Sequence, residues 1–474
     1  MRKNILYIAI AALLFSSCAG ELDTDPAGNK VSDEQLQELV KKDPDLVLSP
    51  MLLGMIDYLH TGNRRASTND RGYMVWNFGM DLQGNDMVLT ALSNWFADEY
   101  MFENLRQQTA SLTADRWYCY YKMVYMANQI LDLIPEDAEG AALVYKAQAL
   151  THRALAYYYL MNLYQDDYMH GGRDKAGVPY YTSAKEGAKG RTPSTEVFAN
   201  ITADLQEAVK IFDDAEYDVL ESVTDIDGAV ANMVLARVAL VTGNYTVAKN
   251  AAAAVIASGY TLMNEEEYTT SGFQSATLPE TIYAYTWAMA TSLENRSFAS
   301  WISRTATDNA NNKGIYVAID YRKKNFMAAA EGKYPAYTNL KFDTPTYRTD
   351  EIYMRLSEAY LLKAEAEARG GDDAAAQQTL FELVSNRDSA YAKSTKTGDA
   401  LLAEIFLQSR IELWGEGHEY FTNKRFNVGV DRSSSTNHQH KAVIPAGKDF
   451  TYQIPLSIEI NSNPNISSSD QNPL

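Results

Sequence analysis

Two stretches of the sequence combine aromatic side chains with amides, carboxylates and a guanidinium, the groups that hold an uncharged, hydroxyl-rich ligand. Aromatic rings stack on apolar sugar faces, while Asn, Asp and Arg side chains satisfy hydroxyl groups. Neither stretch shows sustained helical periodicity, so we expect both to be loops. The candidate ligand-binding residues of the first stretch are Tyr73, Trp76, Asp81, Asn85, Asp86, Asn94 and Trp95. Those of the second stretch are Trp287, Asn295, Arg296, Phe298 and Trp301. Core packing is the alternative for each tryptophan.

Motifs of enzyme active sites are missing from the sequence. It has no glycine-rich phosphate loop ending in lysine, no HExxH and no GxSxG. Glycosidases need two carboxylates at a set separation, but 61 acidic residues make such pairs frequent by chance. His438 and His440 could meet a metal, but their polar surroundings, DRSSSTNHQHK, indicate a solvated loop tip. His418, among glycines, indicates a structural turn. We therefore predict no catalytic residue, no metal and no cofactor.

Composition bounds the class of protein. With 46% apolar and 22% charged residues, the 474-residue chain can bury a sizeable core, which excludes a disordered chain. The 42 basic against 61 acidic residues give a charge of −19 at pH 7, which argues against nucleic-acid binding. The 32 tyrosines exceed an ordinary share. Helix packing explains most of them, and a tyrosine ring also suits a sugar or peptide surface.

The N-terminus has the pattern of an export signal. The basic pair Arg2–Lys3 precedes an apolar run, Ile5–Phe15, which is too short to span a bilayer of about 30 Å. Two serines then precede Cys18, which resembles a bacterial lipoprotein box, where the thiol receives a diacylglycerol. Ordinary cleavage with an incidental cysteine is the alternative. We predict a signal peptide at residues 1–17, lipidation of Cys18, a polar tether at residues 18–30, and anchoring to a membrane without spanning it.

After Cys18 the chain has one further cysteine, Cys119, so the mature protein cannot form an intramolecular disulfide bond. Cys119 lies in an aromatic helical run, WYCYYKMVYMANQIL, and we expect it to be a small buried side chain. A catalytic nucleophile is the disfavoured alternative. Trp117 and Trp414 also lie in helical runs, and we expect them in the core.

Helical periodicity dominates the rest of the chain. Apolar residues recur at steps of three and four within residues 141–164 and again within 194–212. A spacing of alanine, glycine and alanine occurs twice, at Ala236, Gly243 and Ala248 and at Ala364, Gly371 and Ala376. In each copy a glycine turn joins two helices whose small residues permit close approach, as in a tetratricopeptide-type hairpin. Residues 62–99 and 260–350 lack this periodicity and read as irregular insertions that can carry short strands.

Several separated blocks together resemble the SusD/RagB family. They are RALAYYYLMNLYQDDY (153–168), GVPYYT (177–182), RTPSTEVFANITADLQEA (191–208), DEIYMRLSEAYLLKAEA (350–366), RIELWGEGHEYFTNKRF (410–426) and YQIPLSIEINSNPNISSSDQNP (452–473). The blocks at 410–426 and 452–473 are the most specific. Within the first of these, Glu419 and Thr422 stand where the family often has an arginine and an aspartate.

The resemblance implies a mostly α fold, a tetratricopeptide-like helical-repeat superhelix with a loop-rich inserted subdomain containing short strands. We expect one such domain over residues 31–474, with irregular insertions at about 62–99 and 260–350. In the family, residues from the two candidate stretches border the ligand pocket, although no motif transfers residue by residue.

The resemblance also implies a function and a partner. It implies a non-catalytic lipoprotein of the outer membrane, facing the cell exterior, that binds a nutrient, most simply an oligosaccharide. The ligand would pass to a TonB-dependent SusC-like transporter. A peptide-binding member of the family, a surface hydrolase and a scaffold for another protein are the alternatives. The acidic charge disfavours a highly anionic polysaccharide. Two basic clusters, Arg64-Arg65 and Arg322-Lys323-Lys324, are expected on the solvated surface or against the transporter.

Overall fold

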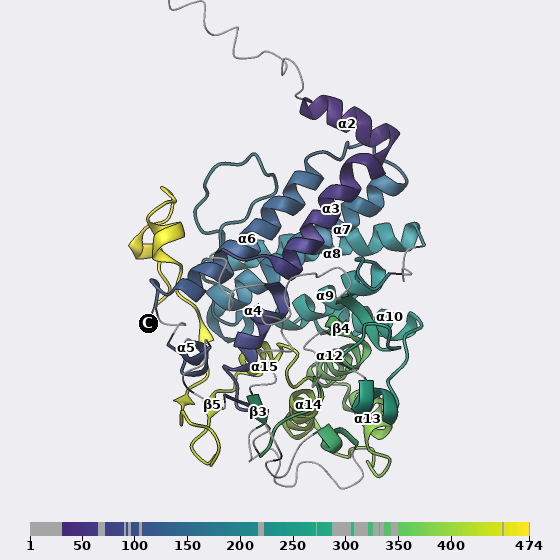
Figure 1. Ribbon diagram of the computed structural model, residues 1–474, viewed down its shortest axis with the longest axis vertical. Helices are drawn as coiled ribbons and strands as arrows, with labels where there is room; N and C mark the ends of the chain where they lie inside the picture. Colours follow the sequence, from purple (N-terminus) through teal and green to yellow (C-terminus); the bar gives the residue numbers. More distant parts are fainter. Residues whose placement is uncertain are drawn as a thin grey trace, which may run out of the picture.

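The protein is mostly helical (Figure 1). The structure, a computed structural model, describes residues 31–64, 72–89, 92, 96–103, 107–216, 222–271, 273–286, 305–307, 321–325, 331, 336–342, 349–447 and 450–473. The α-helices are α2 (Asp33–Lys42), α3 (Pro44–Thr61), α4 (Gly72–Asp81), α5 (Ala97–Tyr100), α6 (Ser111–Leu131), α7 (Ala141–Tyr164), α8 (Ser194–Asp214), α9 (Gly228–Val241), α10 (Tyr245–Ala257), α12 (Leu356–Arg369), α13 (Asp373–Arg387), α14 (Gly398–Glu412) and α15 (Glu419–Arg425). Among the described helices, none combines the length and the apolar character needed to cross a membrane.

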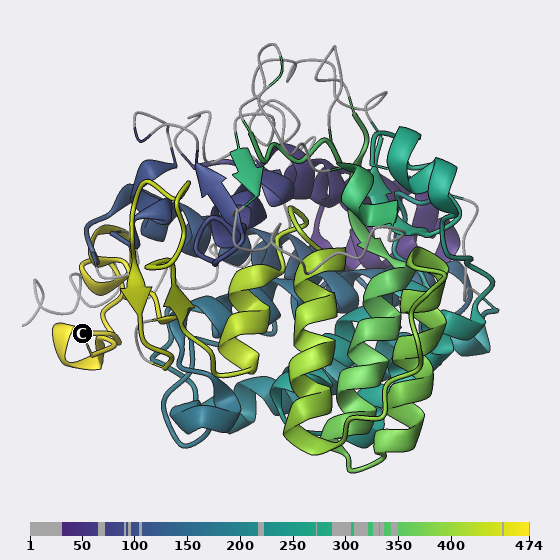
Figure 2. The same cartoon turned by 90° about the horizontal axis from the view of Figure 1, so that it is seen from below.

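Helices that follow each other in the sequence pack together, α6 with α7, α9 with α10 and α12 with α13. Helices α12 and α13 lie side by side among the green helices at the front of Figure 2. The last two pairs are the two copies of the predicted repeat. Gly243 and Gly371 follow α9 and α12 in the left-handed region, at φ of 75° and 85°, and the four alanines of the repeat are buried. Asn244 and Asp372 then cap α10 and α13 through their side chains. The predicted fold class, mostly α with helical hairpins, is confirmed.

Aromatic side chains fill the interface between α6 and α7. The ring of Trp117 meets that of Tyr164 edge-on at 4.8 Å, and Tyr120 stacks on Tyr159 at 5.0 Å. Cys119 and Trp414 are also buried, so the three side chains predicted for the core lie there. Helix packing thus accounts for many of the tyrosines.

The C-terminal segment, residues 450–473, closes this aromatic core (yellow, beside α5 and α6 in Figure 1). The side-chain amide of Asn472 donates to the carbonyl oxygens of Tyr164 and Tyr452, at 2.6 and 2.8 Å. The N–H of Tyr452 donates to the carbonyl of Leu163 at 2.7 Å. The indole N–H of Trp117 donates to the carboxylate of Glu459, on the π-helical turn η7 (Leu456–Ile460), at 3.0 Å.

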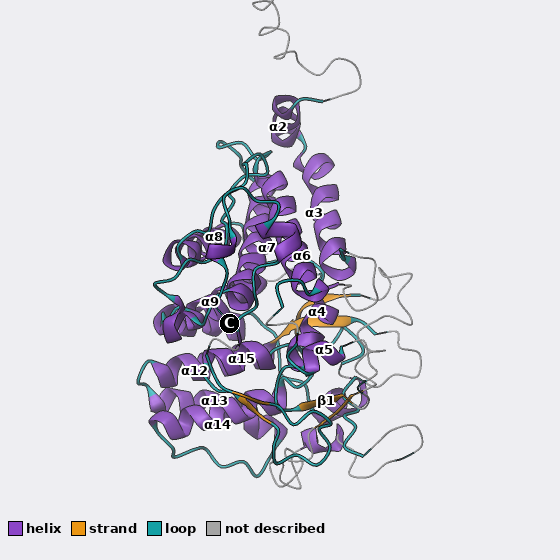
Figure 3. Ribbon diagram, turned by 90° about the vertical axis from the view of Figure 1, so that its left-hand side faces the viewer, coloured by secondary structure: helices purple, strands orange, loops and turns teal. Residues whose placement is uncertain are grey.

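Short antiparallel strands form two-stranded ribbons (orange in Figure 3). The ribbons pair β1 (Met87–Leu89) with β3 (Thr305–Thr307), β2 (Thr281–Tyr285) with β4 (Glu351–Arg355), and β5 (Val430–Asp431) with β6 (Val443–Ile444). In the first ribbon, Met87 lies opposite Thr307 and Leu89 opposite Thr305. This ribbon therefore joins the two segments that the sequence marks as insertions.

Residues 72–81 form helix α4, although the sequence led us to expect a loop there. All ten residues of α4 are buried. A helix buried on every side has no polar face, so its sequence lacks the apolar stripe that reveals a surface helix. The expectation of an irregular segment was wrong for these residues.

Candidate functional site

The candidate residues fall into two groups in the structure. Cys18, Asn94, Trp95, Trp287, Asn295, Arg296, Phe298 and Trp301 lie outside the described residues. The other five, Tyr73, Trp76, Asp81, Asn85 and Asp86, lie on α4 and in the turn between α4 and β1.

Tyr73 and Trp76 pack inside the protein, with 2% and 0% of their surface exposed. The hydroxyl of Tyr73 lies 2.5 Å from that of Tyr159, and its ring meets the ring of Tyr353 edge-on at 4.7 Å. The ring of Trp76 meets Tyr120 at 5.3 Å in the same manner. Neither ring presents a face to solvent, which agrees with core packing, the alternative stated for Trp76.

Asp81 fixes the turn that precedes α15. Its carboxylate accepts hydrogen bonds from the main-chain N–H groups of Gly417 and Glu419, at 2.8 and 2.9 Å. Burial raises the pKa of Asp81 to about 7, against the effect of these two hydrogen bonds. Gly417 has φ of 84°, and a Cβ there would lie 2.3 Å from the Cβ of Asn77. The glycines beside His418 therefore form the structural turn expected from the sequence.

Glu419 forms the second set of contacts between the turn after α4 (residues 81–86) and the turn before α15 (residues 415–419). We call this contact region the junction. The carboxylate of Glu419 accepts hydrogen bonds from the main-chain N–H groups of Asn85 and Asp86. Burial, followed by the nearby charge of Asp86, raises the pKa of Glu419. The guanidinium of Arg410 binds the carboxylate of Asp86 through two nitrogens, with Nε at 2.8 Å. Gly84 is required here, because a Cβ would lie 1.9 Å from the carboxyl carbon of Glu419.

Asn85 connects the same turn to the segment that contains His438. The side-chain oxygen of Asn85 accepts a hydrogen bond from the N–H of Asp431 at 2.8 Å, and its carbonyl lies 2.9 Å from Nε2 of His438. The other ring nitrogen of His438 lies 2.6 Å from the hydroxyl of Tyr100. The junction is thus held by hydrogen bonds between segments far apart in the sequence.

The expectation that His438 lies on a solvated tip is wrong. Only 2% of its surface is exposed, and burial lowers its pKa to about 3, so the ring is neutral at pH 7. Arg432 brings this polar segment inward by donating to the carbonyls of Leu82, Gly84 and Tyr100. Across the described part of the chain, no three His, Cys, Asp or Glu side chains are grouped to hold a metal ion.

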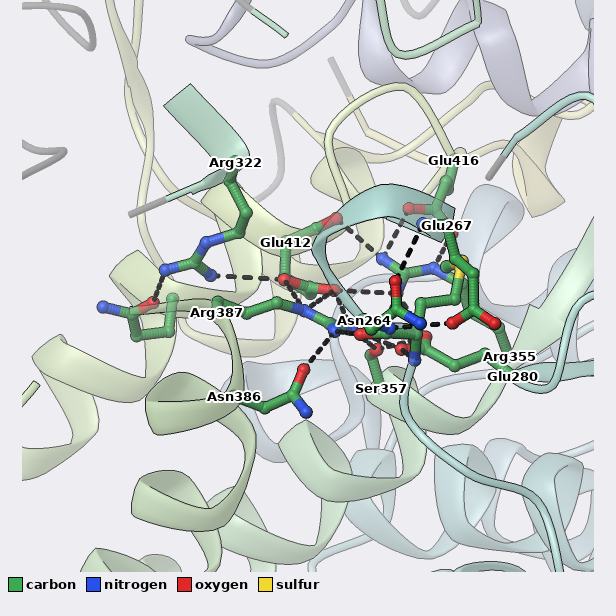
Figure 4. A network of polar contacts seen from close by, with 12 residues as sticks. Asn264, Glu267, Glu280, Arg322, Arg355, Ser357, Asn386, Arg387, Glu412 and Glu416 are labelled. Carbon is green, nitrogen blue, oxygen red and sulfur yellow. Dashed lines mark hydrogen bonds and ion pairs between the residues drawn. The ribbon is translucent and has the colours of Figure 1, made fainter. Parts of the chain in front are cut away.

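A buried ion network joins the start of α12 to the ends of α13 and α14 (Figure 4). The guanidinium of Arg355 donates to Glu412 at 2.8 Å, to Glu280 at 2.9 Å and to Glu416 at 2.6 Å. That of Arg387 donates to Glu412 at 3.0 Å and to Glu280. The side chains of these five residues are at most 6% exposed.

Two cations of the second insertion belong to this network. Nζ of Lys341 donates to Glu416 at 2.5 Å and to the carbonyl of Trp414 at 3.0 Å. Arg322, on the 3-10 turn η5 (Tyr321–Asn325), donates to Glu412 at 3.2 Å and to Gln408 at 2.9 Å. The network therefore fastens the described parts of the insertion to the helical scaffold.

The prediction of a surface position is wrong for Arg322, which is buried. Its partner Glu412 lies 90 residues further along the chain, so the sequence around Arg322 does not reveal the ion pair. Lys324 is exposed and pairs with Glu265. Arg64 donates to the carboxylate of Asp115 at 2.6 Å. Arg65 and the side chain of Lys323 lie outside what the structure describes.

The electrostatics of the network keep its acids ionised. Arg355 and Lys341, opposing the effect of burial, hold the pKa of Glu416 at about 2. Three guanidinium groups likewise hold the pKa of Glu412 well below its usual range. Burial lowers the pKa of Lys341 to about 8. Each of these carboxylates is bound by cations and so holds the fold together.

Comparison with known families gives two matches along the chain. Residues 76–240 match a SusD-like family model described as "Starch-binding associating with outer membrane". Residues 246–473 match the model of the SusD family, SusD_RagB. No curated protein matches the chain in sequence.

Solved structures share the fold. A SusD-like carbohydrate binding protein from Bacteroides vulgatus is 24% identical, with a TM-score of 0.78 over 90% of this chain and 98% of its own. A SusD superfamily protein from Bacteroides thetaiotaomicron is 21% identical, with a TM-score of 0.76 over 90% and 99%. Surface glycan-binding protein A from Bacteroides thetaiotaomicron, in complex with laminarihexaose, is 16% identical, with a TM-score of 0.68 over 90% and 99%. By sequence and by fold, this chain belongs to the SusD/RagB family.

Proposed function

We propose that this protein is a non-catalytic, lipid-anchored binding protein on the outer surface of the cell, which captures a neutral oligosaccharide. The anchor would be the lipidated Cys18, and the ligand would pass to a TonB-dependent SusC-like transporter in the outer membrane. Membership of the SusD/RagB family supports this function, and so does the bound laminarihexaose of a structural neighbour. The charge of −19 favours a neutral glycan over an anionic one.

The observation that carries the proposal is the pairing of β1 with β3. Leu89 and Thr305 lie opposite each other at one end of this ribbon. The chain continues from Leu89 toward Asn94 and Trp95, and it reaches Thr305 from Trp301. Candidate residues from both stretches are therefore connected, through a few residues, to the same end of one ribbon. We propose that the aromatic rings and amides of the two stretches form one binding surface for sugar rings.

Isothermal titration of the mature protein against neutral glycans and peptides tests this function, with chromatography of the mixtures to detect products. We expect at least one glycan to bind and to remain intact. Turnover would instead indicate the hydrolase, and binding of peptides alone would indicate the peptide-binding alternative. If nothing in the panel bound, the capture of these nutrients would be refuted.

Single replacements Trp95→Ala, Trp287→Ala and Trp301→Ala locate the surface. Loss of one stacked ring should weaken glycan binding by about tenfold, which corresponds to about 1.4 kcal/mol. Tyr118→Ala is the matched control, because Tyr118 is an aromatic residue that is 40% exposed on helix α6, outside both stretches. Unchanged affinity in all three tryptophan variants would show that the surface lies elsewhere.

A further inference from the structure

A second surface rich in tyrosine lies far from the ribbon of β1 and β3. It consists of two adjoining hollows, which we call the tyrosine groove, between α6 and the loop of residues 181–188. One hollow, of about 270 Å³, is lined by Tyr121, Tyr125 and Tyr181, and the other, of about 360 Å³, extends toward α2 and α3. Tyr125 and Ala184 line both hollows, so the two meet there. Together they fall within the size range of ordinary ligand sites, about 300–1,000 Å³.

The rings of the groove are held in place by their own contacts. The hydroxyl of Tyr121 donates to the carbonyl of Pro179 at 2.8 Å, and that of Tyr181 accepts from the N–H of Lys189 at 3.1 Å. The two rings meet edge-on at 6.0 Å. Tyr125 is 42% exposed at the meeting point of the hollows. Rings fixed in this way lose little conformational freedom when a ligand stacks on them.

Polar groups border the rings on both sides. The side-chain amide of Gln129 donates to the hydroxyl of Tyr125 at 3.3 Å, and the carboxylate of Asp132 accepts from the hydroxyl of Ser183 at 2.9 Å. Glu186 accepts from the N–H of Thr182 at 3.0 Å. A carboxylate has about four acceptor sites. Asp132 uses one oxygen to accept from Ser183 and Ala184, so its other oxygen retains capacity for the hydroxyl groups of a ligand, whereas Glu186 already binds Thr182 and Lys189.

The charges of the groove favour a neutral ligand. Its carboxylates are those of Asp33, Asp132 and Glu186. Lys185 pairs with Asp33 at 2.6 Å and Lys189 with Glu186 at 2.9 Å, while Nζ of Lys122 lies 4.8 Å from the centre of the Tyr125 ring. These positive and negative charges balance, so the groove has no net charge that would attract phosphates, sulfates or uronic acids. An apolar protein segment would remove these charged groups from water without offering them new hydrogen bonds, at a cost in free energy. A neutral sugar instead offers apolar faces to the rings and hydroxyl donors to the acids.

We propose that the tyrosine groove is a second binding site for a neutral oligosaccharide, an inference that rests on the proposed function for its ligand class. The groove adjoins α2, and α2 lies at the opposite end of the molecule from β1 and β3 (Figures 1 and 3). It is therefore separate from the surface proposed at the ribbon. A long glycan chain bound at both places would gain avidity without a tighter individual site.

Hydrogen exchange of the mature protein, with and without laminarihexaose or maltohexaose, tests the groove. We expect the sugar to slow exchange in residues 121–132 and 181–188. Tyr125→Ala should reduce this protection and raise the sugar concentration needed for it by about tenfold. Tyr118→Ala is the matched control, since Tyr118 lies on the same helix, is similarly exposed and is not among the residues that line the groove.

The outcomes separate the two proposals. If a sugar binds but leaves both segments unprotected, or if Tyr125→Ala behaves as the unmodified protein does, the groove site is overturned and the proposed function stands. If neither hexasaccharide nor any other glycan of the titration panel binds, both are overturned. Protection by a protein partner alone would also refute the sugar site.

Discussion

Asp81 and Glu419, 338 residues apart in the sequence, are joined by a hydrogen bond of 2.9 Å from the main-chain N–H of Glu419 to the carboxylate of Asp81. Glu419 in turn accepts from the N–H groups that follow Gly84. Each segment thus supplies the acceptor for the other. The acid at position 419, where the family often has arginine, fits this arrangement because a carboxylate can accept both main-chain donors.

The buried carboxyl of Asp81 should make stability depend on pH. Its pKa is raised to about 7 in the folded protein, above the ordinary value of 3.8, so the folded state binds the proton more tightly. Its contribution is fully present below about pH 4 and is lost as the pH rises through 7, at up to about 1.4 kcal/mol per pH unit. Asp81→Asn cannot ionise, so its stability deficit relative to the unmodified protein should shrink between pH 5 and pH 8.

Urea denaturation at several pH values measures this change. Asp214→Asn, at an exposed position of α8, is the control and should give a curve parallel to that of the unmodified protein. A deficit for Asp81→Asn that stays constant from pH 5 to pH 8 would show that Asp81 does not titrate in this range.

Gly371 and Gly417 both have left-handed backbone angles, but only at Gly417 would an added Cβ collide with a neighbour. Replacing each with alanine therefore separates the cost of backbone strain from the cost of steric overlap. Gly371→Ala, with no neighbouring atom within 4 Å of the new Cβ, should lower the free energy of unfolding by about 1 kcal/mol, the cost of φ of 85° alone. Gly417→Ala should cost at least about twice as much, because its Cβ would also overlap Asn77. Chemical denaturation of both variants measures the difference, and equal losses would contradict the tight packing of this turn.

Removing one cation from the buried ion network should be costly. Arg355→Met leaves Glu416 and Glu412 without their shared partner, and we expect a loss of about 3–5 kcal/mol in the free energy of unfolding. Lys210→Met breaks an exposed pair on α8 and should leave the denaturation midpoint unchanged. Similar midpoints for the two variants would show that the network contributes little.

Replacement of Cys18 tests the anchor. Cys18→Ala should abolish incorporation of radiolabelled palmitate and release the protein from the outer membrane, because lipidation needs the thiol. Cys119→Ala should retain the label, since Cys119 is buried on α6. Continued labelling of Cys18→Ala would refute the lipoprotein prediction.

The sequence revealed the features that depend on neighbouring residues. The repeat of Ala236, Gly243 and Ala248 could be recognised because close helix contact and a left-handed turn restrict residue types locally. Helix α4 could not be recognised, because a helix buried on all sides lacks the one-sided stripe of apolar residues that marks a surface helix. Arg322 and His438 looked like surface residues, since their partners lie in distant parts of the chain.

Candidate site residues posed a harder problem. An aromatic ring beside an amide suits a sugar site and a polar-rimmed core equally well, and Tyr73 and Trp76 lie in the core. Tyr121 and Tyr125 were missed as surface candidates, because their spacing of four on a helix also fits packing. The excess of tyrosine was the one available signal.

The closure of the α6–α7 core by Asn472 and Tyr452 has a consequence for biogenesis. Helices α6 and α7 are synthesised long before residues 450–473, and their aromatic interface is covered only after that segment has packed against it. Loss of even a short piece of the C-terminus would leave that interface open to water and to other nascent chains. The same dependence delays completion of the fold until residues 450–473 have been synthesised and are free to pack.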